Sequence, residues 1–357
     1  MKRNVTLSLI RLLATMFVIG CHLLEWTGSR LGYGKWVAAT GNYLAVGVEI
    51  FLCLSGYLYG LKADKIFNTP EERMTFICKN VKKILFSCWL WIILVVWPVY
   101  TFLQPGSIYG FRYFTILLAQ YCPLGVHHLW FIPYILFCYC ITPALFDIRQ
   151  YIEKKINTAI GMGLLLVCLT VLLEIVTYLF HGYFTVAYLF CYIIAFFMPA
   201  LNRKRITIKK IFWISLPIAI IGSTCRFYLV YILAPQYSEP IMNFLNWCYI
   251  WSAAALGICI FTGLVAYVKI QPAENTQIAK VLKWSDKYSY EIYIGHNIYI
   301  SGALTLMSIT PYIGVNIAIT VIAIVISGVV LKQIGNCIKS LWGRMHKGKN
   351  KDRTEQS

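Results

Sequence analysis

Residues 5–26 read VTLSLIRLLATMFVIGCHLLEW, an apolar run long enough to cross a lipid bilayer that nevertheless contains ionisable side chains. In a helix, Arg11 and His22 lie within about 20° of each other on one face and roughly 16 Å apart along the axis. Glu25 follows His22 at i+3, near the same face. Because charged groups in a membrane are costly unless they face a protein interior or a wet cavity, this face predicts a functional site. The alternative is a purely structural role for these residues, either as an ion pair or with the arginine extending its charged end to the membrane surface.

The composition of the whole chain is typical of a protein that crosses the membrane many times. Of its 357 residues, 59% are hydrophobic and 13% are charged, and the mean hydropathy is +0.67. The first apolar segment is too long, and too polar in its middle, for a cleaved signal sequence, so we expect a retained span. The 13 cysteines lie mostly in apolar segments and form no CxxC pair, which indicates buried thiols and no metal site.

Apolar segments of about 20 residues predict an all-α fold with about ten transmembrane helices. The helices are expected near residues 5–25, 42–61, 82–103, 127–146, 158–180, 183–201, 211–233, 244–267, 289–308 and 312–335. A tight turn at Thr310 and Pro311 would join the last two. The semi-polar segment 104–126 could hold a re-entrant or interfacial piece around residues 111–120.

The formal net charge of +18 is concentrated in loops on one side of this predicted fold. The loops of the opposite side hold only three basic residues, Arg30, Lys35 and Arg112. Because Lys and Arg accumulate on the cytoplasmic side of membrane proteins, we expect both termini to be cytoplasmic. Residues 1–335 would then form the membrane-embedded domain and residues 336–357 a short basic tail. Anionic lipid headgroups, and not nucleic acid, are the expected partners of this charge.

Further ionisable residues lie in the expected helices. Those placed in the outer half of the membrane are Glu49, His127, His128, Glu174 and Arg226, whereas Glu291 and His296 are placed at the inner end and the middle of the ninth helix. With Arg11 they predict a polar column, which suits transfer from a charged cytosolic donor to an acceptor on the outer face. Structural alternatives are a Glu174–Arg226 ion pair and a helix cap by Glu291.

A basic run, KNVKK, occupies residues 79–83 at the start of the third expected helix. Lys79, Lys82 and Lys83 could bind a phosphorylated donor through their ammonium groups. The ordinary excess of positive charge on the cytoplasmic side explains the same run equally well.

Five motifs in this order resemble the acyltransferase-3 family of membrane-embedded acyltransferases. They are the Arg11–His22 pair, residues 47–57 (GVEIFLCLSGY), the basic run 79–83, residues 128–132 (HLWFI) and residues 289–296 (SYEIYIGH). The resemblance covers about residues 5–335. The basic run departs from the family pattern because it has lysines where arginines are usual, and lysine cannot give a bidentate fork to a phosphate.

The resemblance implies an O-acyltransferase embedded in the bacterial cell membrane. It would take an acyl group, commonly acetyl, from acetyl-CoA in the cytoplasm, which serves as a co-substrate and not as a bound cofactor. The acceptor would be a hydroxyl of a surface polysaccharide or of a lipid-linked sugar. Polysaccharide-assembly proteins are further partners that this role implies.

The mechanistic hypothesis makes His22 the general base on the acceptor hydroxyl, with Glu25 or Glu49 orienting its imidazole. Arg11 would bind a phosphate or the pantetheine carbonyl of the donor, together with the lysines of the basic run. Three residues are predicted to contact the acceptor, namely His128, Trp130 and Arg226.

Two functions of other classes compete with this hypothesis. In a transporter or flippase of polysaccharide or lipid-linked sugar, the same polar column would be the substrate path, but the sequence shows no defensible internal repeat. A non-catalytic sensor or scaffold of a polysaccharide-assembly complex would need neither His22 nor Arg11 for more than stability.

Overall fold

The computed structural model describes residues 5–30, 34–62, 67–103, 127–155, 158–179, 186–203, 208–227, 239–268 and 276–354. Within these ranges the regular structure is all helical, with no strand, which confirms the predicted all-α class. The helices are α1 (Val5–Arg30), α2 (Gly34–Leu44), α3 (Gly47–Gly60), α4 (Pro70–Trp91), the π-helical η1 (Ile92–Val96), α5 (Trp97–Leu103), the 3-10 turn η2 (His127–Trp130), α7 (Phe131–Lys155), α8 (Thr158–Leu179), α9 (Val186–Arg203), α10 (Ile208–Phe227), α11 (Glu239–Tyr267), α12 (Gln277–Ile300) and α13 (Ile313–Thr354). The expected re-entrant piece at 111–120 lies outside the described residues.

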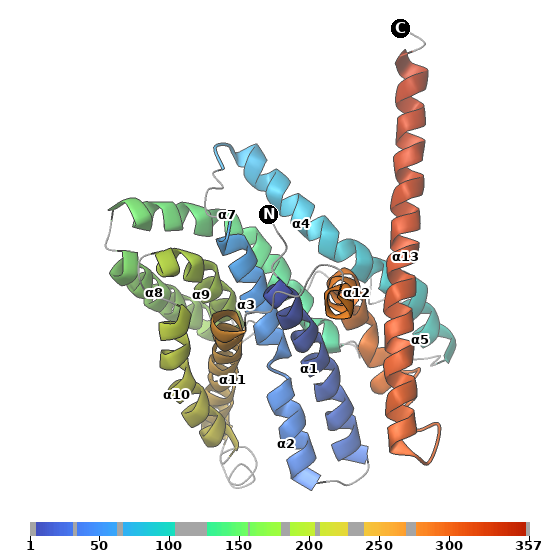
Figure 1. Ribbon diagram of the computed structural model, residues 1–357, viewed down its shortest axis with the longest axis horizontal. Coiled ribbons are helices and arrows are strands. Elements are labelled where there is room, and N and C mark those ends of the chain that lie inside the picture. Colours follow the sequence, from blue (N-terminus) through green and yellow to red (C-terminus); the bar gives the residue numbers. More distant parts are fainter. Residues whose placement is uncertain are drawn as a thin grey trace.

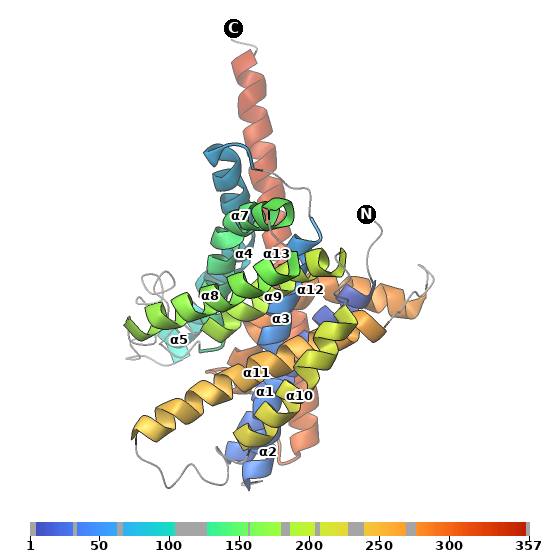
Figure 2. The same cartoon turned by 90° about the vertical axis from the view of Figure 1, so that its left-hand side faces the viewer.

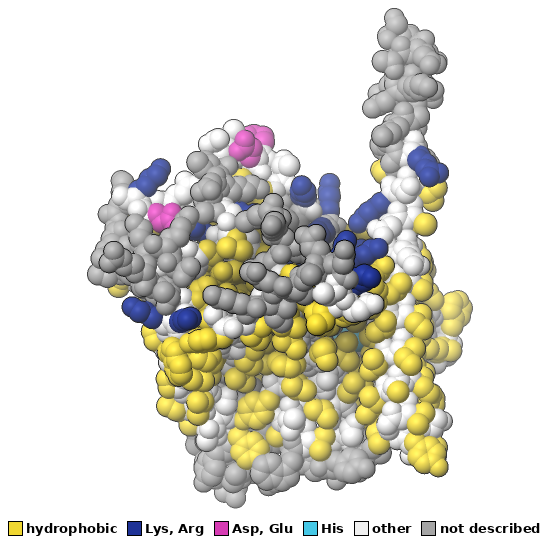
Figure 3. All heavy atoms as spheres, viewed as in Figure 1, with side chains coloured by type: hydrophobic (Ala, Val, Ile, Leu, Met, Phe, Trp, Pro, Cys, Tyr) yellow, Lys and Arg dark blue, Asp and Glu magenta, His cyan; other side chains and the backbone are white. Residues whose placement is uncertain are grey.

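The helices make the chain a multi-pass membrane protein. Seven in the described ranges are long and apolar enough to cross a bilayer: Val5–Ser29, Ala39–Gly60, Pro70–Leu103, Phe131–Lys154, Ile208–Cys225, Trp247–Tyr267 and Ile313–Trp342. Three other predicted spans also coincide with helices. Two of these helices are apolar but shorter, Gly163–Ile175 and Val186–Leu201, and the third is the more polar α12. Lys and Arg gather at one end of the face in Figure 3, above a broad apolar belt. The count of about ten spans and the cytoplasmic placement of the termini stay predictions.

Helix α3 lies in the middle of the molecule, with α8 to α11 on one side and α12 and α13 on the other (Figure 1). Two glycines let α3 press against α9. A Cβ at Gly56 would lie 2.1 Å from the Tyr192 carbonyl oxygen, and a Cβ at Gly60 would lie 2.1 Å from that of Phe196. Small residues at such crossings allow membrane helices to approach backbone to backbone.

This contact predicts that Gly56→Val prevents normal packing of the fold. The two backbones would have to separate, because the obstacle is a carbonyl oxygen and not a flexible side chain. We expect a loss of roughly 3 kcal/mol or more, measured as a lower melting temperature in detergent or as loss of monodisperse protein. Gly163→Val in α8 is the matched control, because nothing lies within 4 Å of its added Cβ. Equal stability of the two variants would contradict the close α3–α9 contact.

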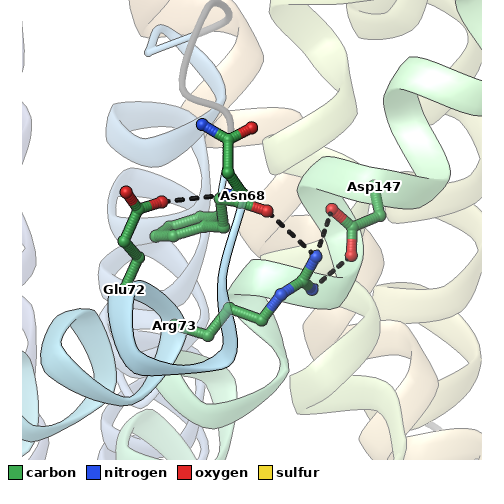
Figure 4. Close-up of polar contacts among 5 residues, drawn as sticks. Asn68, Glu72, Arg73 and Asp147 are labelled. Carbon is green, nitrogen blue, oxygen red and sulfur yellow. Dashed lines mark hydrogen bonds and ion pairs between the residues drawn. The ribbon is translucent and has the colours of Figure 1, made fainter.

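The start of α4 is tied to α7 by a polar cluster (Figure 4). Thr69 caps α4, because its side-chain hydroxyl accepts a hydrogen bond from the backbone N–H of Glu72. In return, the Glu72 carboxylate accepts a hydrogen bond from the backbone N–H of Asn68 at 2.9 Å. Arg73 pairs with Asp147 of α7 and donates to the Phe67 carbonyl at 3.2 Å. The cluster fixes the start of α4 against α7, and α4 carries the basic run.

Two features of the last helices differ from the sequence expectation. Helix α12 begins at Gln277, well before residue 289, with Thr276 capping it by accepting from the Ala279 backbone N–H. It ends at Ile300, so residues 301–312 connect it to α13, and the predicted tight turn at Thr310 and Pro311 is wrong. The Asn316 side chain organises this connection, since its amide donates to the carbonyls of Met307 and Thr310 at 2.9 and 2.8 Å.

Helix α13 is continuous from Ile313 to Thr354 and projects well beyond the other helices (Figure 1). The boundary that we placed between residues 335 and 336 falls inside this helix. The division into a membrane domain and a basic tail stays a prediction.

Candidate active site

Helices α1 and α12 bring two histidines together. The ring centroids of His22 and His296 lie 5.0 Å apart, and the rings are tilted by 35°. The His296 side chain is fully buried, whereas His22 is half-buried. The sequence placed both residues inside membrane helices, and the structure makes them a pair, called here the histidine pair.

Hydrogen bonds define which ring nitrogens of the histidine pair carry protons. His22 Nδ1 lies 3.2 Å from Glu25 Oε2, and His296 Nδ1 lies 2.5 Å from the Tyr293 carbonyl oxygen. A carboxylate and a carbonyl only accept, so Nδ1 is the protonated nitrogen in both rings. In the neutral form, each imidazole then has its basic lone pair on Nε2. Nε2 is therefore the nitrogen at which a neutral His22 can accept a proton.

Of the two carboxylates predicted to orient His22, Glu25 makes this hydrogen bond. Glu49 is buried in α3 and packs on α11, where a Cβ on Gly257 would lie 2.5 Å from the Glu49 Cβ. Ligand atoms of Cys21, His22 and Glu25 lie within 4.8 Å of one another, a spacing that could hold a metal ion. The expectation that no metal is needed stays a prediction.

Aromatic rings from three helices form a cluster beside His296. The Tyr293 ring lies 5.6 Å from that of His296 and 5.7 Å from that of Phe131 in α7, and Phe51 of α3 lies 6.4 Å from Tyr293. The aromatic cluster of Phe51, Phe131 and Tyr293 therefore borders the histidine pair on its buried side, at His296. The adjoining Trp130 ring lies 4.8 Å from the Tyr188 ring of α9.

A second polar contact joins α1 to α12, towards the start of both helices. Arg11 Nη1 donates to Asp286 Oδ1 at 2.8 Å, and Ser8 Oγ donates to Asp286 Oδ2 at 2.6 Å. Asp286 is not among the predicted site residues, because the sequence predicts a start of this helix only near residue 289. An arginine inside a span requires a partner, and that requirement was the signal for a nearby carboxylate.

The spacing of the two contacts shows how α1 and α12 are aligned. Eleven residues separate Arg11 from His22, and ten separate Asp286 from His296. Two helices that lie side by side and run in the same direction can make both contacts only if the residue spacing on one helix matches that on the other to within about one residue. The site therefore has two poles roughly 16 Å apart, an arginine pole at Arg11–Asp286 and the histidine pair.

Further cations lie near the arginine pole. The electrostatic neighbours of the Lys83 ammonium are Arg11, Lys332, Lys62 and Glu291. Glu291 is buried and accepts hydrogen bonds from Lys332 Nζ at 2.8 Å and from Ser87 Oγ at 3.0 Å. Lys332 and Lys62 were not predicted for the site. Glu291 lies in the interior of α12, so its predicted role as a helix cap is wrong.

The remaining predicted residues are placed as follows. Lys79 and Lys82 are exposed on α4, within one turn of Lys83. Glu174 accepts hydrogen bonds from the indole N–H groups of Trp247 and Trp251 at 3.3 and 2.9 Å. The side chains of His128 and Arg226 lie outside the described part of the structure.

The fold and the site define a class of protein, a multi-pass membrane protein with ionisable groups paired across two of its helices. The chain belongs to the acyltransferase-3 family, whose sequence model, described as an acyltransferase domain, matches residues 4–332. This match confirms the resemblance carried by the five motifs and identifies a membrane acyltransferase. Comparisons with curated proteins and with solved structures gave no match.

Proposed function

We propose that the protein transfers an acetyl group from cytoplasmic acetyl-CoA to a hydroxyl of a cell-surface polysaccharide or lipid-linked sugar, in the inner membrane of a bacterium. The observation that carries this proposal is the alignment of the arginine pole and the histidine pair on α1 and α12. A phosphate-binding end and a proton-accepting end, separated by roughly 16 Å, suit a donor whose long pantetheine arm joins its phosphates to its thioester.

The donor would bind with its phosphates at the arginine pole. Arg11, Lys83 and Lys332 supply positive charge there, and only Arg11 offers the fork that binds phosphate bidentately. Asp286 holds the guanidinium in place through its contact with Nη1. The exposed Lys79 and Lys82 would attract the anionic donor to this end of the molecule.

Acyl transfer would take place at the histidine pair. His22 Nε2 accepts the proton of the acceptor hydroxyl as the oxygen attacks the thioester carbonyl. The tetrahedral adduct collapses with cleavage of the C–S bond, and the thiolate of coenzyme A leaves and takes up the proton from His22. Glu25 stabilises the imidazolium between these two proton transfers. The aromatic cluster of Phe51, Phe131 and Tyr293 would limit access of water to the thioester from the His296 side.

The test is transfer of a labelled acetyl group by the purified protein in lipid nanodiscs. With acetyl-CoA labelled in the acetyl group and a sugar acceptor, we expect the label to appear in the acceptor as an ester. Protein that is folded, by size-exclusion chromatography and melting temperature, but transfers no label to any sugar acceptor would overturn the proposal. Movement of an unmodified sugar lipid between leaflets would then favour a flippase.

A further inference from the structure

An apolar groove of about 600 Å³ lies among α8, α9, α10 and α11, on the other side of α3 from α12 (Figure 2 views these four helices directly). Its walls include Phe190 and Ile194 of α9, Ile214 and Ile218 of α10, and Ile258 of α11. Along α10 the lining extends from residue 211 to residue 225, a length of about 20 Å.

The position of the groove indicates what fills it. Helices α10 and α11 both contain membrane-spanning segments, and Ile214 and Ile218 are 64% and 54% exposed. The groove therefore faces the region that the hydrocarbon of the bilayer would occupy, and its apolar walls suit a hydrocarbon chain. Lipid tails are as apolar as the walls, so selection of one chain over others must come from shape and from a polar group at the groove's end.

Such a polar group is present where α10 ends. Trp247 and Trp251 line the groove there, and both indole N–H groups donate to the Glu174 carboxylate of α8. The Phe244 ring stacks on Trp247 with a centroid distance of 6.2 Å. Indole faces pack against the C–H face of a sugar ring, and a carboxylate accepts hydrogen bonds from sugar hydroxyls. The groove thus continues into an aromatic and acidic end that suits a sugar.

We propose that the groove holds the hydrocarbon chain of a lipid-linked glycan, with the sugar nearest the lipid at the Glu174, Trp247 and Trp251 end. This inference rests on the proposed function and specifies its acceptor as a glycolipid rather than a free polysaccharide. Helix α11 separates the groove from α3, because its Gly257 packs on Glu49 while Ile258 lines the groove. The hydrocarbon chain therefore stays beside the bundle and anchors the acceptor, and the hydroxyl that reaches His22 belongs to a sugar farther along the glycan than the one at Glu174.

The test compares two acceptors that carry the same oligosaccharide, one with a long alkyl chain and one with a methyl group. Ile218→Trp fills the groove, whereas Ile221→Trp adds the same bulk at a position that is 63% exposed on the same helix and outside the groove lining. We expect Ile218→Trp to lower kcat/KM for the long-chain acceptor by about tenfold or more, through loss of packing in the groove. Its kcat/KM for the methyl glycoside should be unchanged, and Ile221→Trp should resemble wild type with both acceptors.

Two results would overturn the groove assignment while leaving the proposed function intact. One is a wild-type enzyme that uses both acceptors equally well. The other is an equal effect of Ile218→Trp and Ile221→Trp, which is expected if bulk phospholipid chains fill the groove. A wild-type protein that acylates neither acceptor would instead overturn the proposed function.

Discussion

Replacing His22 with alanine is expected to lower the turnover number for acyl transfer by about 10²- to 10⁴-fold, the usual contribution of a general base. The KM for acetyl-CoA should change little, since the donor phosphates bind at the arginine pole and not at the histidine pair. The measurement is steady-state release of the coenzyme A thiol in nanodiscs, at matched amounts of folded protein. A turnover number equal to that of wild type would remove His22 from the chemistry.

Glu25→Gln is a milder variant whose loss of turnover is compared with that of His22→Ala. The glutamine can still accept a hydrogen bond from His22 Nδ1 through its amide oxygen, but it no longer offers a negative charge to the imidazolium. We expect a smaller loss of turnover, about tenfold, in line with the loss of one charge-assisted hydrogen bond. A larger loss than in His22→Ala would show that Glu25 has a role apart from His22.

Replacing Asp286 with alanine is expected to raise the KM for acetyl-CoA by about 10- to 100-fold, the effect of losing a hydrogen bond that holds a charged group. Arg11 would keep its charge but lose the carboxylate that fixes its guanidinium. The turnover number at saturating donor should stay close to wild type, because the histidine pair is intact. A raised KM for acetyl-CoA with an unchanged turnover number would show that Asp286 acts in positioning the donor and not in catalysis.

The Arg11→Ala/Asp286→Ala double variant is the control for this positioning role. If Asp286 acts through Arg11, the double variant should be no worse than Arg11→Ala alone, since groups that act as a unit are not additive. Additive losses in the double variant would contradict the assignment. So would an Asp286→Ala variant with a lower turnover number and an unchanged KM.

The parts of the site that follow from local geometry could be predicted from the sequence. Helical periodicity alone places Arg11, His22 and Glu25 near one face of α1, and the structure adds the Glu25–His22 hydrogen bond. The motif at residues 289–296 drew attention to His296. The family assignment was also within reach, because it depends on the order of motifs and not on how the helices pack.

Contacts between helices were harder to predict, and Asp286 shows why. The first part of α12 carries several lysines, so its low hydropathy resembles that of a loop, although Thr276 offered an N-cap signal. Lys332 lies near the end of the last expected span, residues 312–335, and no partner was predicted for it. Its pairing with Glu291 depends on the relative register of α12 and α13, which no single helix encodes. Tertiary register also decides that Glu49 packs on Gly257.

Acyl transfer at His22 in the living cell is measured by the O-acetyl content of the surface polysaccharide and lipid-linked sugars of the host. Three strains are compared, namely a deletion, the deletion complemented with wild type, and the deletion complemented with His22→Ala at an equal membrane level. We expect acetylation to be lost on deletion, to be restored by wild type and not to be restored by His22→Ala. Unchanged acetylation in all three strains, with altered export or amount of polymer, would contradict this expectation.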